Sequence, residues 1–201
     1  MSDSNFSDQN RGEQAAYYLA LGYFMQTFAV VEATMQVILW KASGIPDMKT
    51  ATALLSGVKI DSAMSLIRRV RETKKLAEHM GLEHAFQQLG VINSARNDIV
   101  HFGATFLEGI GPTISNFRAA HIQERIRGFI VSPRILVDMT ADLTTITNRL
   151  LEIAQNYDDN PCCDGAVLDA WLYKHKLLTN NRQKNPDKTP KRQRPQKPSR
   201  G

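Results

Sequence analysis

One short stretch, in which the apolar residues have helical spacing, contains Asn93, Arg96, Asn97 and His101. Asn93, Asn97 and His101 follow one another at intervals of four residues, so a helix stacks them along one face. Arg96 lies on the adjoining face. An imidazole transfers protons near neutral pH and a guanidinium holds anions, so these residue types together can perform acid–base chemistry on an anion.

A purely structural interpretation of the same residues stays open. Arg96 can pair with an acidic residue of a helical bundle, and His101 can stabilise the negative end of the helix dipole. Packing alone does not explain the arginine, because its neighbours along the stripe are all apolar. These neighbours are Ala85, Leu89, Ile92 and Ile99.

Hydrophobic periodicity predicts helices on both sides of this segment. The motif-bearing helix is expected from Leu82 to about His101, with its end near Gly103. Asp47 is a plausible N-cap, and Ser132 followed by Pro133 is typical of a helix start. The other helices are expected over residues 15–40, 48–55, 61–81 (closed by Gly81) and 133–157.

Between residues 104 and 131 the pattern changes to short β-favouring runs separated by glycine and proline. The runs are Ala104–Leu107, Thr113–Ala119 and Ile126–Val131. They predict a small antiparallel β insertion. The expected fold class is therefore all-α, an up-and-down helical bundle with a small antiparallel β insertion and a disordered C-terminal tail.

The chain divides into four predicted parts. They are a flexible N-terminus (1–12), the helical bundle (13–157), a C-terminal helical extension (158–178) and a disordered basic tail (179–201). Trp171 and Tyr173 of the extension are expected to lie on the body of the domain.

The first predicted helix is apolar on two faces. One stripe contains Leu19, Tyr23 and Val30, and the other contains Tyr17, Phe24, Phe28, Met35 and Leu39. Gln26, Glu32 and Gln36 interrupt the apolar run, and a carboxylate in the bilayer costs at least about 2–3 kcal/mol. We therefore expect the centre of a bundle or a dimer interface rather than a membrane span.

The basic character of the chain comes from its end. The formal net charge is +5, but residues 179–201 carry eight basic residues against one acidic residue, a net charge of +7, which leaves −2 for residues 1–178. Four of the eight prolines also lie in this segment. The tail is either a solubilising end or a non-specific electrostatic arm for a polyanion such as nucleic acid.

No cofactor or metal is expected. Cys162 and Cys163 are adjacent, and with His175 they lack the paired spacing of zinc sites. The sequence contains neither a Walker A loop nor a Rossmann glycine pattern. One thiol pair and a polar start without the features of an export signal favour the cytoplasm.

Arg96–Asn97–Asp98–Ile99–Val100–His101, followed by Phe102–Gly103, resembles the R-x4–6-H motif of HEPN domains. The likeness covers about residues 14–157. Phe28–Ala29–Val30–Val31–Glu32 is similar to the glutamate-bearing first helix of many members, and the predicted order of helices and β insertion also matches.

The resemblance implies a helical bundle that acts as a metal-independent endoribonuclease, in the role of a toxin or defence effector. His101 would be base or acid, Arg96 would hold the phosphate, and Asn97 would orient either partner or the RNA. Glu32 and Asn93 would support them, with Glu32 as a buried partner of Arg96. The resemblance further implies a homodimer in which two motifs face one cleft, and a possible antitoxin or other protein partner.

A second interpretation comes from another class of protein. In it the chain is a non-catalytic helical RNA-binding or protein-interaction module, in which Arg96 and His101 are structural and the tail binds nucleic acid or a partner. The position of these side chains in the fold bears on the choice between the two interpretations.

Overall fold

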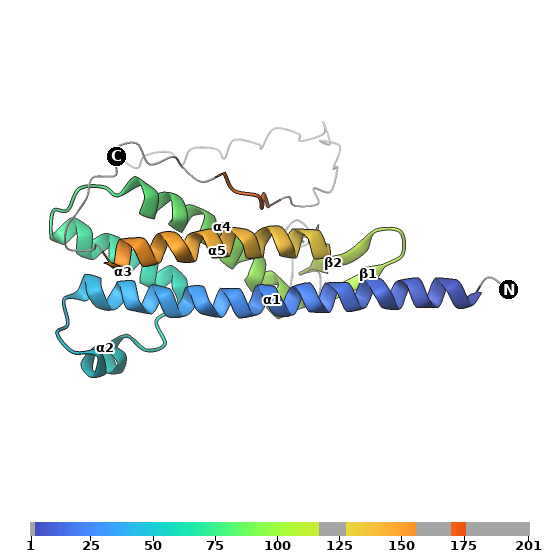
Figure 1. The fold of residues 1–201 in the computed structure, drawn as a ribbon, viewed down its shortest axis with the longest axis horizontal. Helices are drawn as coiled ribbons and strands as arrows, with labels where there is room; N and C mark the ends of the chain where they lie inside the picture. Colours follow the sequence, from blue (N-terminus) through green and yellow to red (C-terminus); the bar gives the residue numbers. More distant parts are fainter. Residues whose placement is uncertain (1–2, 117–127, 156–169, 176–201) are drawn as a thin grey trace, which may run out of the picture.

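Helix α1 (Asp3–Ser43) extends along the long dimension of the molecule, and the other elements are arranged beside it (Figure 1). The computed structural model describes residues 3–116, 128–155 and 170–175. The other elements are α2 (Met48–Leu55), α3 (Ile60–Thr73), α4 (Met80–Phe102), β1 (Ala104–Leu107), β2 (Gly111–Ser115), β3 (Gly128–Ile130) and α5 (Pro133–Gln155). The described chain is mostly helical with one small antiparallel sheet, as the sequence predicts.

The core lies where α1, α3, α4 and α5 pack together. Helix α5 lies along α1 and also packs on α4, while α3 contacts both α1 and α4. Large apolar side chains from these helices are almost completely buried, including Phe24, Phe28, Ile67, Leu89 and Leu143. Burial of each such side chain contributes about 1.5–3 kcal/mol, which is the main force that holds the helices together.

The bundle buries only one of the two apolar stripes of α1. The stripe with Tyr17, Phe24 and Phe28 faces the core, and each of these side chains is at most 1% exposed. In the other stripe, Leu19 and Tyr23 are each 65% exposed. The expectation of a helix at the centre of the bundle is therefore wrong for this second stripe, which faces away from the core.

Helix α1 begins at Asp3, so residues 3–12 are helical where the sequence predicts a flexible N-terminus. Extending an existing helix adds one hydrogen bond per residue without a new nucleation cost. A polar sequence can therefore continue the helix beyond the part that the core stabilises.

Among the described helices, none is by itself long and apolar enough to cross a membrane, and α1 and α2 pass that test only as a pair bent by 112°.

Helix α3 ends earlier than predicted, at Thr73 instead of Gly81. Lys75 has a left-handed backbone (φ 53°), and two hydrogen bonds close a Schellman motif: Leu76 N to Arg71 O (3.0 Å) and Lys75 N to Glu72 O (2.9 Å). Glycine usually occupies this position, so a lysine there gives no sequence signal. Gly81 instead lies buried in the first turn of α4.

Two predicted helix starts are confirmed by side-chain caps. Asp47 Oδ1 accepts a hydrogen bond from Thr50 N at 2.8 Å at the start of α2. Ser132 Oγ accepts one from Ile135 N at 3.3 Å, directly before Pro133 begins α5. These bonds satisfy backbone N–H groups that the first turn of a helix leaves unpaired.

The β insertion forms a three-stranded antiparallel sheet in the order β1-β2-β3. Ile114 of β2 pairs with Phe129 of β3, and both side chains are buried against the helices. Phe106 of β1 packs edge-on against Tyr17 of α1, with ring centroids 5.3 Å apart. Strands β2 and β3 differ in their bounds from the predicted runs, and residues 117–127 lie outside the described part.

Residues 170–175 cross the bundle without helical structure, although the sequence predicts a helical extension there. Asp142 of α5 explains the difference, because its carboxylate accepts hydrogen bonds from Leu172 N and Tyr173 N, each at 2.9 Å. Gln88 of α4 donates to the same carboxylate (2.8 Å) and to Tyr173 O (3.0 Å). The rest of 158–178 and the 179–201 tail lie outside the described residues.

Both aromatic side chains of this segment lie on the body, as predicted. Tyr173 is 5% exposed, and Trp171 stacks on His84 with ring centroids 4.8 Å apart. We refer to residues 170–175 as the strap, because they cross α4 and α5 and are held there by Asp142.

We predict that Asp142→Ala lowers the free energy of unfolding by about 3 kcal/mol, because it leaves two backbone N–H groups and the Gln88 amide without their acceptor. Urea denaturation measures this loss. The control is Asp138→Ala on the same helix, which removes an ion pair to Arg134, a side chain that is 79% exposed. It should cost about 0.5 kcal/mol. Equal losses of unfolding free energy in the two variants contradict the role of Asp142 as the acceptor that holds the strap.

A second prediction concerns His79, whose Nδ1 accepts a hydrogen bond from Leu82 N (3.2 Å) at the start of α4. Burial, then the charge of Arg71, lowers the pKa of His79. The unfolded chain therefore binds the proton first, so stability falls as the pH drops below about 6.5. His79→Asn keeps a capping oxygen without titrating. Its unfolding free energy, measured from pH 7 to pH 5, should fall less than that of the wild type.

Candidate functional site

Arg96 lies in the apolar stripe of α4 and reaches the surface beside α1. Ile92 and Ile99, its neighbours along the stripe, are buried, whereas the Arg96 side chain is 26% exposed. The guanidinium carbon lies 4.9 Å from the centre of the Phe28 ring. This cation–π contact fixes the guanidinium over α1, with its apolar face against the ring.

The polar edges of the guanidinium are only partly satisfied. Arg96 Nη1 donates to Asn97 Oδ1 at 3.1 Å, and Nη2 lies 4.0 Å from Glu32 Oε1. Arg96 Nε is buried and has no hydrogen-bond partner in the described structure. The two Nη groups make only this hydrogen bond and this long contact, so they, and not the buried Nε, retain donors for an anion.

Glu32 supports Arg96 less closely than the sequence predicts. Its side chain is 47% exposed, and the 4.0 Å separation is at the limit of an ion pair. The expectation of a buried partner is therefore wrong, since α1 places this carboxylate at the edge of the bundle. The pair contributes little to stability at such exposure.

Asn93 binds a residue outside the predicted site. Its amide is buried, and Nδ2 donates to both carboxylate oxygens of Asp61, at 3.0 and 3.1 Å. Asp61 lies in the first turn of α3. Asn93 therefore ties α4 to α3, a structural role that its spacing from Asn97 and His101 does not reveal.

His101 lies in the last turn of α4 and is exposed to solvent. The helix ends directly after it, where Gly103 has a left-handed φ of 65° and its N–H donates to Ile99 O at 3.0 Å. A glycine is favoured at this turn, because other residues rarely adopt a positive φ. The imidazole lies one turn beyond Asn97, the residue that binds Arg96.

The structure therefore brings Arg96, Asn97 and Glu32 together and places His101 one helical turn away on the Asn97 face. It separates Asn93 from the set. The arrangement offers a fixed cation with unused donors and an accessible imidazole at the same end of α4. This combination can bind an anion and transfer a proton near it.

Sequence reasoning missed a second polar group near this end of α4. Tyr173 Oη and His175 Nδ1 lie 2.6 Å apart, and the His175 ring packs edge-on against Phe129 at 4.9 Å between centroids. Burial, and secondarily the charge of Asp98, raises the pKa of Tyr173. Only the aromatic content of the strap hinted at its burial, since no local pattern links residue 173 to residue 98.

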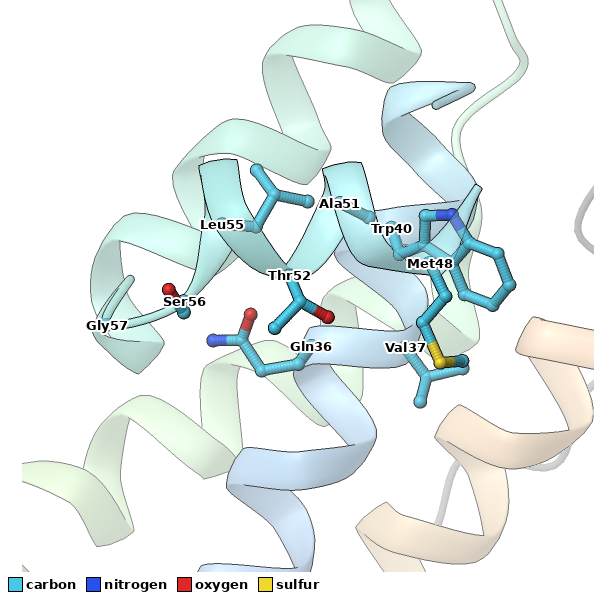
Figure 2. Close-up of a pocket in the computed structure, with 9 residues that line it drawn as sticks. All are labelled: Gln36, Val37, Trp40, Met48, Ala51, Thr52, Leu55, Ser56 and Gly57. Carbon is cyan, nitrogen blue, oxygen red and sulfur yellow. The ribbon is translucent and has the colours of Figure 1, made fainter. Parts of the chain in front are cut away.

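A separate pocket lies near the C-terminal end of α1, between this helix and α2 (Figure 2). Its volume is about 370 Å³, and its walls are mostly apolar. The lining residues include Val37, Trp40, Met48, Ala51 and Leu55. It contains none of the predicted site residues.

Comparisons with known proteins add no identification: no family model, no curated protein and no solved structure matches the chain. Within the described residues, no group of three or more His, Cys, Asp or Glu side chains could hold a metal ion. Cys162 and Cys163 lie outside those residues.

The surroundings of the two site residues predict different costs of removal. His101→Ala should change the free energy of unfolding by about 0.5 kcal/mol or less, because the imidazole is exposed. Arg96→Ala should cost about 1 kcal/mol, because it removes the contact with Phe28. Thermal and urea denaturation measure both. A loss well above 1 kcal/mol for His101→Ala indicates a structural histidine.

Proposed function

We propose that this protein is a HEPN-like, metal-independent endoribonuclease that cleaves RNA through attack of the 2′-hydroxyl on the adjacent phosphate. The observation that carries the proposal is the arrangement around Arg96. Its guanidinium is held over Phe28 with Nη donors unused, and the exposed His101 lies at the same end of α4. The spacing of these residues is that of the family motif.

Each residue has a role that follows from its chemistry. Arg96 binds the nonbridging phosphate oxygens and stabilises the negative charge that develops on them. Asn97 holds the guanidinium through its Oδ1, which leaves its Nδ2 to contact the RNA backbone or His101. Glu32, 4.0 Å from Nη2, attracts the guanidinium only weakly.

His101 moves the proton. Its imidazole removes the 2′-hydroxyl proton as the 2′-oxygen forms a bond to phosphorus. The bond from phosphorus to the 5′-oxygen breaks, and that oxygen receives a proton from the imidazolium. The products are a 2′,3′-cyclic phosphate and a 5′-hydroxyl, and no metal ion takes part in the step.

The proposal includes the setting in which the enzyme works. Cleavage of cellular RNA is toxic, so we propose a toxin or defence effector that acts in the cytoplasm as a homodimer. An antitoxin or other protein partner would restrain it. The basic residues of 179–201 would supply non-specific attraction to the RNA backbone.

The test is incubation of the purified protein with labelled RNA in the presence of EDTA. We expect cleavage by the wild type and a loss of about 100-fold or more in rate for His101→Ala, because acid–base catalysis typically contributes at least that factor. Arg96→Ala should lose a similar factor. The matched control is His84→Ala, which removes a histidine from the same helix, where it stacks on Trp171, and should leave the rate within about twofold.

Mass spectrometry of the products checks the chemistry, since only 2′-hydroxyl attack leaves a cyclic phosphate. Cleavage that requires magnesium, or that persists in His101→Ala, rejects the mechanism. Deletion of residues 179–201 separates affinity from chemistry. It should weaken salt-dependent RNA binding without changing the nature of the products.

A second candidate function is a helical interaction module without catalysis. The exposed apolar stripe of α1 favours it, because large exposed apolar patches usually mark interaction surfaces. Under this function, neither the wild type nor the variants His101→Ala and Arg96→Ala cleave RNA. Binding of a partner then depends on the exposed stripe of α1. The same set of variants therefore discriminates between the two functions.

A further inference from the structure

Helix α2 is joined to α1 at both of its ends and stands apart from it in between. Trp40 Nε1 donates to Ile45 O at 2.8 Å just before α2, and Gln36 Nε2 donates to Val58 O at 3.0 Å just after it. Ala51 is the buried residue of α2, and its side chain is a single methyl group. The space that remains between the two helices is the pocket of about 370 Å³.

The size and lining of this pocket fit a small, neutral molecule. Pockets that bind small molecules have volumes of about 300–1,000 Å³ and mostly apolar walls with a few polar groups. Here Trp40, Met48 and Leu55 make the walls apolar, and none of the described lining residues carries a charge. A phosphate would lose its hydration there without gaining a counter-ion. The pocket therefore favours an uncharged ligand.

Gln36 supplies a polar group of specific geometry. Its bond to Val58 O uses one hydrogen of Nε2, so the other hydrogen and the carbonyl Oε1 have no partner in the described structure. The carboxamide therefore offers one donor beside one acceptor. Such a pair binds a planar molecule that presents an acceptor beside a donor, as glutamine does with N7 and the N6 amino group of adenine.

The hydroxyl of Thr52 adds a second polar group to the lining. Threonines elsewhere in the helices donate this hydroxyl to the carbonyl four residues earlier. Thr52 makes no such bond within the described residues, so its hydroxyl remains available to a ligand. Figure 2 shows Ser56 and the Gln36 amide toward one end of the pocket, and Trp40 and Met48 toward the other. The ligand thus meets a polar end and an apolar end.

We propose that this pocket binds a planar, uncharged heteroaromatic ring that carries a hydrogen-bond donor next to an acceptor, which is the chemistry of a nucleobase. The edge of the ring bonds the Gln36 amide, and its face packs against Trp40. Stacking on an aromatic side chain adds affinity for any base, whereas the amide selects the edge. Because Ile45 and Val58 hold the indole and the amide in place beforehand, binding orders little of the protein.

Two sources can supply such a base: a free molecule, or an RNA strand whose phosphate is bound at Arg96. Gln36 lies one helical turn after Glu32 on the same face of α1, so the pocket is near the candidate site along this helix. Only the second source rests on the proposed function. Binding of a free base is measured without any cleavage, so the two proposals fail separately.

Fluorescence of Trp40 measures binding in a Trp171→Phe chain, because the sequence contains only these two tryptophans. We expect adenine to quench this emission saturably. Purine, which lacks the amino group of adenine, should bind about tenfold more weakly, and Gln36→Leu should remove this preference. Quenching that does not saturate overturns the proposal. Equal affinities of the wild-type pocket for adenine and purine, or a preference that Gln36→Leu retains, also overturn it.

Two alanines of α2 give a matched pair of variants that test the location. Ala51 lines the pocket, whereas Ala53 is exposed and is not among the lining residues. Ala51→Leu fills the space and should weaken adenine binding at least about tenfold, while Ala53→Leu should bind as the unmodified pocket does. Circular dichroism should show the same helix content in both. Equal adenine affinities of the two variants overturn the location.

The neutral lining gives a further test of the ligand class. Adenosine 5′-monophosphate should bind no more tightly than adenosine, because no lining residue is positively charged. A gain in affinity from the phosphate overturns the assignment to an uncharged ligand.

A short oligoadenylate distinguishes the two sources of the base, on chains with His101→Ala so that the strand is not cleaved. If the base belongs to RNA, the oligonucleotide should quench Trp40 with at least about tenfold higher affinity than adenosine, and Arg96→Ala should remove that gain. The absence of a gain, or a gain that Arg96→Ala leaves unchanged, assigns the pocket to a free molecule.

Discussion

Helix α1 carries two apolar faces, and a bundle of this size can cover only one of them. The core takes the face with Phe24 and Phe28, which binds α1 to α5 and α3. The opposite face, with Leu19, Tyr23 and Val30, remains in water. Exposed apolar surface carries a hydration cost that burial against a partner removes, so this constraint links the fold of one chain to its assembly.

The same helix positions the candidate site. Phe28 is buried by the core, yet its ring supports the Arg96 guanidinium, which would otherwise be a costly cation in an apolar stripe. Asn97 and Glu32 hold the edges of that guanidinium only loosely, and Nε has no partner. The Nη groups therefore keep donors that can bind an anion, whereas the buried Nε cannot reach one. His101 adds an accessible proton carrier where α4 ends.

Long-range polar contacts close the rest of the bundle. Asp142 uses one buried carboxylate to hold the strap across α4 and α5, and the strap brings Tyr173 and His175 to the neighbourhood of Asp98. Because these hydrogen bonds are made in the interior, their geometry fixes the path of the strap. The strap therefore lies where a helix was expected, with its backbone N–H groups directed at Asp142.

Sequence patterns alone were sufficient for the helix order, the β insertion and the caps at Asp47 and Ser132, because these depend on local spacing and local hydrogen bonds. The Arg96–Asn97–His101 set was found from the spacing of the chemistry-bearing residues in the motif. Where α3 ends was not predictable, since a left-handed lysine at position 75 replaces the usual glycine.

Tertiary structure decided the rest. Asn93 binds Asp61 on another helix, Glu32 lies at the edge instead of the interior, and one apolar stripe of α1 stays exposed. Each outcome depends on which elements pack against a residue from far along the chain. Periodicity shows that a helix face is apolar or polar, but only the packing of the whole bundle determines which face it covers and which it leaves to water or to a partner.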